Sequence, residues 1–193
     1  MLAVSIVYAL ALHEYAHALA ADLQGDRMPR AFGRLTLNPA KHLDPLGTLM
    51  IFLVGFGWAK PVEFRPSALS SKRFGAAIVA LAGPMMNILL ATLAALVLAV
   101  FSIDPFESVT GTFLRYFFSL NVLLAVFNLL PLPPLDGSRL LTIFLPPDRQ
   151  GIIYFLDKYG FIILLALVFF GGIRFIEPLI DGLGSLILTL TGH

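Results

Sequence analysis

The first 21 residues decide the fold, and they read MLAVSIVYALALHEYAHALAA from Met1 to Ala21. Outside the pentapeptide HEYAH at residues 13–17, this run is almost wholly apolar. A helix of this length, at about 1.5 Å per residue, just crosses a hydrocarbon core of about 30 Å. Because the run has no basic n-region and carries two histidines, we expect a retained membrane span and not a cleaved signal peptide.

The composition of the whole chain also indicates a membrane protein. Its 193 residues are 58% hydrophobic and 13% charged, against about 25% charged residues in soluble domains, and the mean hydropathy is +0.88. So few charges cannot cover a soluble globule, whereas a lipid bilayer accepts such a surface. The formal net charge of +1 argues against a nucleic-acid partner. We predict one compact domain over residues 1–193.

The three ionisable side chains inside the first span need a partner, because each costs about 2.5–3.5 kcal/mol in mid-membrane even on a mild insertion scale. His13 and His17 lie four residues apart and therefore share a helix face. This H-E-x-x-H spacing lets both imidazoles reach one zinc ion while Glu14 sits beside the open position of the metal. The alternatives are a buried polar cluster or a chance match in a soluble helix.

A third protein ligand is expected, because a catalytic zinc usually has three and the chain contains no cysteine. Asp136 is the best candidate, since it lies in the segment NLLPLPPLDG at residues 128–137, a helix end broken by prolines that leaves its carboxylate free. The same residue fits equally well as the cap of a following helix, expected at residues 138–145. His42 is more typical of a surface or capping histidine, and His193 is the last residue, where disorder is the default.

The role of Glu14 follows from its position between the two histidines. Zinc lowers the pKa of a bound water toward about 7, and a carboxylate next to a ligand can take its proton. Glu14 is therefore expected to be the general base. Service as a metal ligand is the alternative, which the spacing disfavours because the two histidines already use the facing positions.

Further apolar runs complete the expected fold. Runs long enough to span a bilayer occupy residues 74–101, 111–132 and 151–170. Residues 173–190 are apolar but interrupted by charges and a proline, so this segment either crosses the bilayer or lies on its surface. We predict an all-α polytopic membrane protein, a bundle of about four to six transmembrane helices, with a core at residues 1–137 and C-terminal helices at residues 138–193.

The segment between the first two strong spans is expected to stay on one side of the membrane. Residues 31–37 alternate well enough for a short strand. Residues 45–56 are apolar but too short for a confident crossing, and they continue into GWAKPV at residues 57–62. We expect a re-entrant or interfacial piece followed by a small membrane-associated extended or β segment.

The distribution of basic residues predicts the topology. Eight of the 13 lysines and arginines fall between residues 27 and 73, namely Arg27, Arg30, Arg34, Lys41, Lys60, Arg65, Lys72 and Arg73. The positive-inside tendency places this segment in the cytoplasm. The N-terminus is then outside, residues 102–110 are outside, and residues 131–150 are cytoplasmic. The histidine pair and Asp136 therefore lie at similar depth on the cytoplasmic side and can meet.

Polar residues within the later spans have structural as well as functional interpretations. Asn121 and Asn128 lie in the third span, where a side-chain amide most often joins neighbouring helices. Asn128, close to the proline turn, is also placed to bind a substrate backbone or a developing oxyanion. The motif GPMMN at residues 83–87 is typical of close helix packing and a possible kink.

Taken together, these motifs give the chain a family resemblance. It resembles the site-2 protease family of intramembrane zinc metalloproteases, especially its minimal prokaryotic members without a PDZ domain. The resemblance rests on HEYAH at residues 13–17, AGPMMN at 82–87 and the segment at 128–137. The GWAKPV stretch is similar to the membrane-associated extended segment of that family. The match extends from Met1 to about Gly137.

The resemblance implies a zinc metalloendopeptidase of the cell membrane that cuts peptide bonds in or near transmembrane segments of substrate proteins. It implies one Zn²⁺ per chain held by His13, His17 and Asp136, with Glu14 as the catalytic base and Asn128 as a substrate-binding residue. The residues alone leave two other classes open. One is a transporter or channel whose ionisable groups bind a passing cation, and the other is a catalytically silent scaffold for transmembrane partners.

Overall fold

The computed structural model describes residues 1–54, 57–144 and 150–192, and it is built from helices. No β-strand occurs among the described residues, where the β-type pairing is an isolated antiparallel bridge between Leu43 and Ala59. The prediction of an all-α membrane protein is therefore confirmed, and a regular β segment is not formed in the described ranges. The α-helices are α1 (Leu2–Leu23), α2 (Met28–Ala31), α3 (Pro45–Val54), α4 (Lys72–Val100), α5 (Val109–Asn128), α6 (Gly137–Phe144), α7 (Gln150–Phe169) and α8 (Glu177–Thr191).

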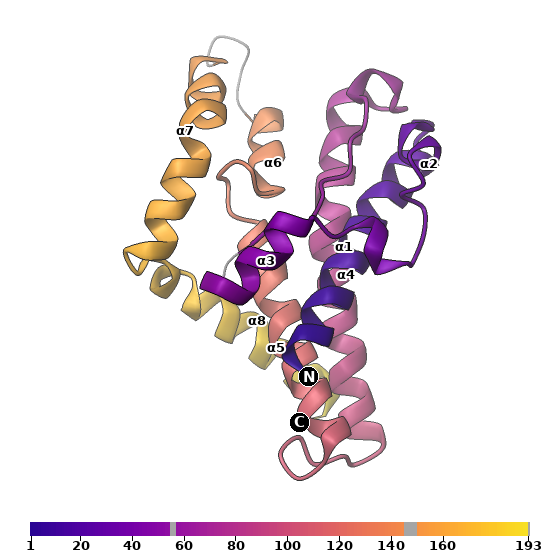
Figure 1. The fold of residues 1–193 in the computed structure, drawn as a ribbon, viewed down its shortest axis with the longest axis vertical. Coiled ribbons are helices and arrows are strands. Elements are labelled where there is room, and N and C mark those ends of the chain that lie inside the picture. The colour runs from indigo at the N-terminus through magenta and orange to yellow at the C-terminus, as the bar shows by residue number, and fades with distance from the viewer. Residues whose placement is uncertain (55–56, 145–149, 193) are drawn as a thin grey trace.

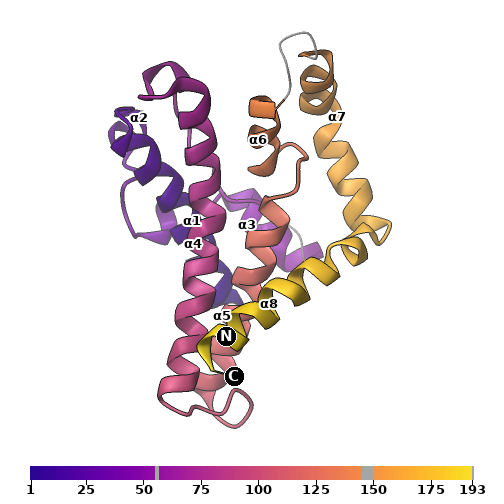
Figure 2. The same ribbon diagram turned by 180° about the vertical axis from the view of Figure 1, so that it is seen from behind.

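Three of these helices are long and apolar enough to cross a membrane. They are α1, α4 over residues 74–100, and α5. Figures 1 and 2 show α4 running alongside α1 on one side and α5 on the other, so the three form one bundle. The expected span at 151–170 corresponds to α7, which is not among the candidate spans found in the described residues. The predicted number of about four to six transmembrane helices therefore stays a prediction.

Small side chains allow the three helices to pack closely. Ala9, Ala16 and Ala18 of α1 are almost fully buried, as expected where helices associate in lipid through van der Waals contact. On the far side of α4, Ala91 and Ala95 form a core cluster with Val122 of α5 and Ile187 of α8. Because alanine is small, the helix backbones lie close together at these contacts. Short side chains of one helix can therefore contact the neighbouring helix.

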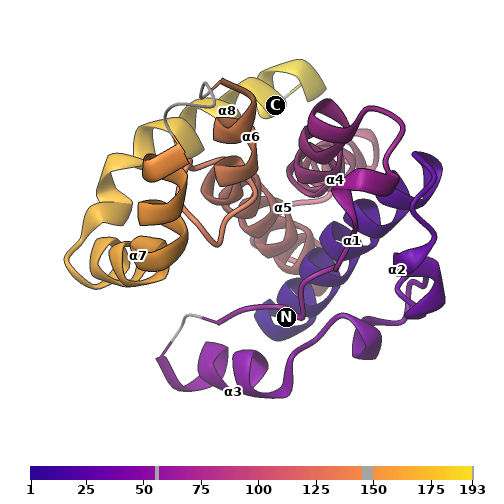
Figure 3. The ribbon, with the colours of Figure 1, turned by 90° about the horizontal axis from the view of Figure 1, so that it is seen from above.

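The C-terminal helices are arranged differently. Figure 3 shows α7 standing apart from the α1, α4, α5 bundle, while α8 lies against the side of α4 and α5. The 15 residues of α8 are fewer than a span needs. The segment at residues 173–190, whose placement the sequence leaves open, thus includes a short helix packed on the bundle.

The predicted strand at residues 31–37 is wrong. Its first residue closes the short helix α2, and Gly33 then turns the chain with a φ of +67°. The Arg34 N–H donates to the Pro29 carbonyl at 2.9 Å, which closes that turn. Alternation in the sequence was misleading because no extended neighbour pairs with these residues.

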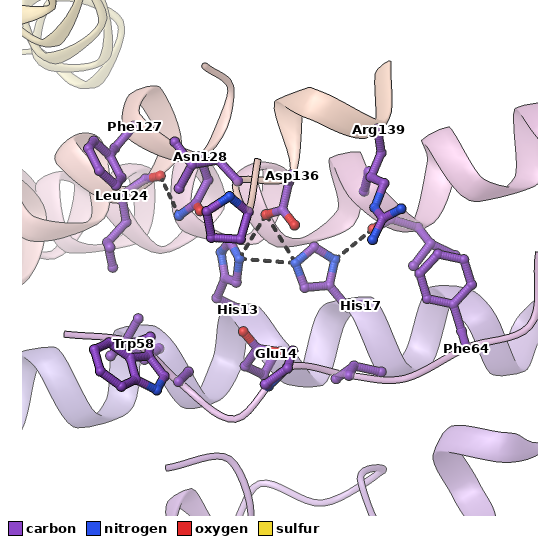
Figure 4. A pocket seen from close by; sticks show the side chains of 18 of the residues that line it. His13, Glu14, His17, Trp58, Phe64, Leu124, Phe127, Asn128, Asp136 and Arg139 are labelled. Atoms are coloured by element: carbon purple, nitrogen blue, oxygen red, sulfur yellow. Dashed lines mark hydrogen bonds and ion pairs between the residues drawn. The ribbon is translucent and has the colours of Figure 1, made fainter. Parts of the chain in front are cut away.

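The interpretation of residues 45–62 as a short apolar piece followed by an extended one is supported. Residues 45–54 form α3, and residues 57–65 then run without helix or strand as a segment that we call the strap. Residues 55–56 of the predicted segment lie outside the described residues. The strap passes beside α1 at the level of its histidines, as Figure 4 shows.

Candidate metal centre and active site

Two imidazoles and one carboxylate meet between α1 and the turn that follows α5. His13 Nε2 lies 3.0 Å from His17 Nε2 and 3.1 Å from Asp136 Oδ2, and His17 Nε2 lies 3.2 Å from the same oxygen. Both histidines are nearly inaccessible, at 3% and 6% exposure. Figure 4 shows the three side chains pointing toward one another. The geometry thus brings Asp136 within reach of both rings, as the sequence predicts.

The other nitrogen of each ring is held by an oxygen. His13 Nδ1 lies 2.5 Å from Asn87 Oδ1, and His17 Nδ1 lies 2.7 Å from the Val79 carbonyl oxygen. Because both oxygens are acceptors only, each Nδ1 must carry the proton and donate it. In the neutral rings the proton-free Nε2 atoms are then the ones that face each other and Asp136.

This donor set fits a divalent metal ion such as zinc. Three electron-pair donors converge, and with both Nδ1 atoms protonated the neutral rings have no proton to share among them. Ligand atoms about 2.0–2.1 Å from a tetrahedral zinc lie about 3.3 Å from one another, close to the three separations of 3.0, 3.1 and 3.2 Å. Within the described ranges, these residues form the one group of three such side chains found suitable for a metal ion.

Helix α4 fits around the imidazoles through Gly83. A Cβ atom at this position would lie 2.4 Å from His17 Nε2 and 2.6 Å from His13 Nε2, closer than nonbonded atoms tolerate. Val79 lies one turn before Gly83 on α4, and Asn87 lies one turn after it. The three residues share one helix face. Val79 and Asn87 each supply a hydrogen-bond acceptor to one histidine, and Gly83 between them leaves room for both rings.

Glu14 lies at the edge of a cavity in front of the imidazoles. The cavity measures about 260 Å³ and is bounded by α1, the strap, α4, the end of α5 and the turn carrying Asp136. Figure 4 shows the half-buried Glu14 carboxylate between the strap and the histidines. Glu14 is not a member of the three-residue group. This placement favours the predicted role of base over that of ligand.

The strap is held from both ends by side chains of the segment after α1. Arg34 donates one Nη to the Lys41 carbonyl and the other to the Lys60 carbonyl. Asp26 accepts from the backbone N–H of Arg65 at the other end of the strap. Between these anchors, Val62 and Phe64 line the cavity while Glu63 is exposed, which is the alternation of an extended chain.

Charge and burial act in opposite directions at Asp26. Burial alone would raise the pKa of this carboxyl, but the hydrogen bonds it accepts from Arg65 and from the Met28 N–H hold that pKa below its ordinary value. Asp26 is completely buried, so its ionised form depends on these donors.

Of the two interpretations given for His42, the surface position is wrong and the capping position is confirmed. His42 is the C-cap of the 3₁₀ helix Pro39–Lys41, and its N–H donates to the Pro39 carbonyl at 2.9 Å. His42 is completely buried, its Nε2 lies 2.8 Å from the Thr36 carbonyl oxygen, and its own carbonyl accepts from the Lys60 N–H. Burial lowers the pKa of this imidazole. His42 is not in the three-residue group and supports the strap instead. His193 lies outside the described residues.

Asn128 lies at the C-terminal end of α5 and lines the cavity, as Figure 4 shows. Its side-chain nitrogen donates to the Leu124 carbonyl at 3.0 Å. The amide is thereby oriented by its own helix at the edge of the space in which a substrate would lie. Its predicted substrate contact stays a prediction.

Sequence analysis missed several residues that shape this site. Val79 contributes only a backbone oxygen, which no side-chain pattern reveals. Arg34 looked like one of many basic loop residues, although it is 5% exposed. Gly83 and Asn87 belong to a motif that the sequence analysis interpreted as helix packing. Their spacing of four residues places them on one face of α4, and this is the face that contacts the histidines.

The chain matches the model of peptidase family M50 over residues 1–110 and 100–167. It is 40% identical over 172 residues to YwhC of Bacillus subtilis (strain 168), a protein described as a candidate zinc metalloprotease, and the match covers 86% of this chain and 78% of YwhC. No solved structure matches it.

Two mycobacterial proteins named Rip2, with the same description, are also similar. Identity is 35% over 164 residues for the protein of Mycolicibacterium smegmatis and 31% over 179 residues for that of Mycobacterium tuberculosis (strain H37Rv). The matches cover 82% and 90% of this chain, but 62% and 65% of the two Rip2 proteins. The chain therefore spans a little under two thirds of the length of Rip2.

Proposed function

Because the chain belongs to peptidase family M50, we propose that it is an intramembrane zinc metalloprotease that hydrolyses peptide bonds in or near transmembrane segments of its protein substrates. The observation that carries the proposal is the convergence of three proton-free donor atoms, 3.0–3.2 Å apart, on a cavity that also contains a carboxylate. The membrane setting follows from α1, which carries both histidines and is long and apolar enough to span a bilayer.

The metal site in this proposal consists of His13, His17 and Asp136. When bound there, zinc supplies Lewis acidity toward a carbonyl oxygen and a water of lowered pKa. The hydrogen bonds from Nδ1 of both rings orient the imidazoles, in the manner of the outer partners that usually hold metal-bound histidines. Asp136 brings the single negative charge of the donor set.

Glu14 is the proton carrier. It follows His13 directly on α1, so its side chain projects beside the histidine face and not onto it. In the proposed reaction its carboxylate accepts a proton from the attacking water and delivers this proton to the amine that leaves. A positioned carboxylate in this role contributes about 10²–10⁴-fold to the rate.

The strap offers a place for the substrate backbone. A helical substrate keeps its carbonyls in its own hydrogen bonds and must unwind locally before a peptide bond is accessible. Among the described residues, the N–H groups of Val62 and Phe64 have no protein partner. An unwound substrate segment can pair with this part of the strap by strand addition, with Asn128 as a further contact across the cavity.

The proposed orientation places the site toward the cytoplasm and the N-terminus outside. Basic residues between α1 and α4 support it. Because the chain contains no cysteine, single cysteines introduced at Lys41 and at Glu107 report their side of the membrane. In intact cells a membrane-impermeant maleimide is expected to label the Glu107 position alone, and labelling of the Lys41 position would reverse the orientation.

The activity is tested with purified protein in lipid vesicles and two probes. One probe is β-casein, a flexible soluble polypeptide, and the other is a single-span membrane protein with an Asn-Pro pair in mid-span. We expect about one zinc per chain by elemental analysis and cleavage of the single-span probe, with fragments identified by mass spectrometry. Glu14→Gln is expected to keep the zinc and lose about 10²–10⁴-fold in rate, whereas Asp136→Asn is expected to lose zinc.

Two results would contradict the proposal. One is wild-type protein with stoichiometric zinc that cuts neither probe faster than Glu14→Gln does. The other is zinc flux into sealed vesicles without cleavage, which would identify a cation transporter.

A further inference from the structure

A line of buried amides continues from His13 into the middle of the helix bundle. Asn87 of α4 receives the His13 contact on its Oδ1, at 2.5 Å from Nδ1. The Asn87 side-chain nitrogen donates to Asn121 Oδ1 of α5 at 2.8 Å, and the Asn121 nitrogen donates to the Phe117 carbonyl at 2.8 Å. Both asparagines have no solvent exposure at all.

The line has a direction that its last member imposes. The Phe117 carbonyl can only accept, so Asn121 must turn its NH₂ toward it and its oxygen toward Asn87. Asn87 must then present its NH₂ to Asn121 and its oxygen to His13. At His13 this oxygen can accept only from a protonated Nδ1. The orientation of Asn121 thus fixes the orientation of Asn87 and, through it, the tautomer of the imidazole.

We propose that Asn87 and Asn121 are positioning residues that hold His13 in its Nδ1-protonated form with the Nε2 lone pair aimed at the metal. The inference rests on the proposed function, because it takes His13 to be a zinc ligand. Asn121 acts through Asn87, and Asn87 acts through the histidine, so neither asparagine touches the substrate or the metal.

A purely structural role accounts for less of this geometry. Side-chain amides commonly join helices within membranes, and a bond between Asn87 and Asn121 alone would join α4 to α5. Joining α4 to α5 does not need the contact between His13 and the Asn87 oxygen. That contact is nevertheless the shortest of the three, at 2.5 Å against 2.8 Å for the other two. Both of its ends are buried, where an unmatched polar group is costly.

The choice of an amide also suits the surroundings. Histidine ligands often donate to a carboxylate, but a carboxylate at position 87 would be a fully buried negative charge beside the ring whose other nitrogen already faces Asp136. Asparagine supplies the acceptor without the charge. Its NH₂ group supplies the link to Asn121, which a carboxylate cannot make.

The test measures zinc affinity by competition with a chromophoric chelator, together with the visible absorption of the cobalt-substituted protein. Asn87→Ala is expected to weaken zinc binding about 10–100-fold and to change the cobalt spectrum, because the His13 ring loses its orientation. Asn121→Leu is expected to weaken binding less, since Asn87 remains but is free to flip. Asn87→Asp keeps an acceptor for His13 and is expected to bind zinc more tightly than Asn87→Ala.

A matched control separates positioning from packing. Val122 is the neighbour of Asn121 on α5, is buried in the core cluster and lies outside the amide line. Val122→Ala is expected to lower the Tm of the metal-free protein through a cavity while leaving the zinc affinity and the cobalt spectrum unchanged.

The outcomes distinguish this inference from the proposed function. Wild-type protein that binds no zinc would refute the proposed function and this inference with it. If wild-type binds zinc and Asn87→Ala binds it as tightly, with a Tm lowered as in Val122→Ala, only the positioning role is wrong. Should Asn87→Ala fail to fold, weaker zinc binding by Asn121→Leu than by wild type, with the zinc affinity of Val122→Ala unchanged, supports the inference. Zinc affinity of Asn121→Leu equal to that of wild type overturns it.

Discussion

The two walls of the site are held in opposite ways. On the helix side, both imidazoles of α1 are buried and each is held at its Nδ1 atom by an oxygen of α4, from Asn87 or Val79. On the strap side, two side chains hold the backbone at Lys60 and Arg65, and the N–H groups of Val62 and Phe64 between them have no partner in the part of the chain that the structure describes. Fixed lone pairs suit metal binding, whereas unpaired backbone suits the recognition of an extended chain.

The difference predicts that damage to the helix side removes the metal, and that damage to the strap weakens the substrate contact alone. The following substitutions test this separation.

The largest effect is expected from Gly83→Ala. The added methyl group would lie within 2.6 Å of both Nε2 atoms, so α4 and α1 must separate or the rings must turn away. We expect zinc binding to fall below detection in elemental analysis of the purified protein, with proteolysis lost as a consequence. The matched control is Gly182→Ala on α8, where nothing lies within 4 Å of the new atom, and this variant is expected to bind zinc like wild type.

An intermediate effect is expected from Arg34→Lys. The guanidinium bridges the Lys41 and Lys60 carbonyls with two nitrogens, and a single ammonium group cannot reproduce that fork. We expect KM for the single-span probe to rise by roughly 5–20-fold, or about 1–2 kcal/mol, with kcat and zinc content nearly unchanged. Arg27→Lys, an exposed position with one ion pair to Asp22, serves as the control. Loss of zinc in Arg34→Lys would break the separation between the two walls.

The smallest effect is expected from Asp26→Asn and depends on pH. The folded protein holds the pKa of this carboxyl below the ordinary value of about 3.9. Its stabilising contribution is therefore complete above that ordinary value and is lost as the pH falls through the lower folded value. The Tm of wild type is expected to exceed that of Asp26→Asn by a few degrees at pH 7, and the gap is expected to close as the pH falls below about 4.

A nearby carboxylate provides the reference for this titration. Glu63 is exposed on the strap, so Glu63→Gln is expected to have nearly the Tm of wild type at pH 7. A gap between wild type and Asp26→Asn that stayed constant down to acid pH would show that ionised Asp26 does not anchor the strap.

Much of the site was predictable because its signals are local. The four-residue spacing of His13 and His17 defines a common helix face whatever surrounds it. The prolines before Asp136 indicated that the third span ends shortly before this carboxylate. The helix α5 ends at Asn128, a few residues earlier than the expected span at 111–132. In contrast, the strand at residues 31–37 and the surface position of His42 were wrongly predicted. Arg34 reaches the Lys60 carbonyl, and His42 lies against the Thr36 carbonyl, and the local pattern reveals neither contact.

The sequence by itself determined the apolar runs that form the three candidate spans, a metal-binding spacing within the first of them, and a chain suited to lipid. These are properties of composition and periodicity, which neighbours along the chain express without tertiary contact. Only the tertiary structure decided that Asp136 meets His13 across 123 positions and that Asn87 meets it across 74. Such contacts depend on which alanine and glycine faces let the helices approach, and that is settled by packing between elements.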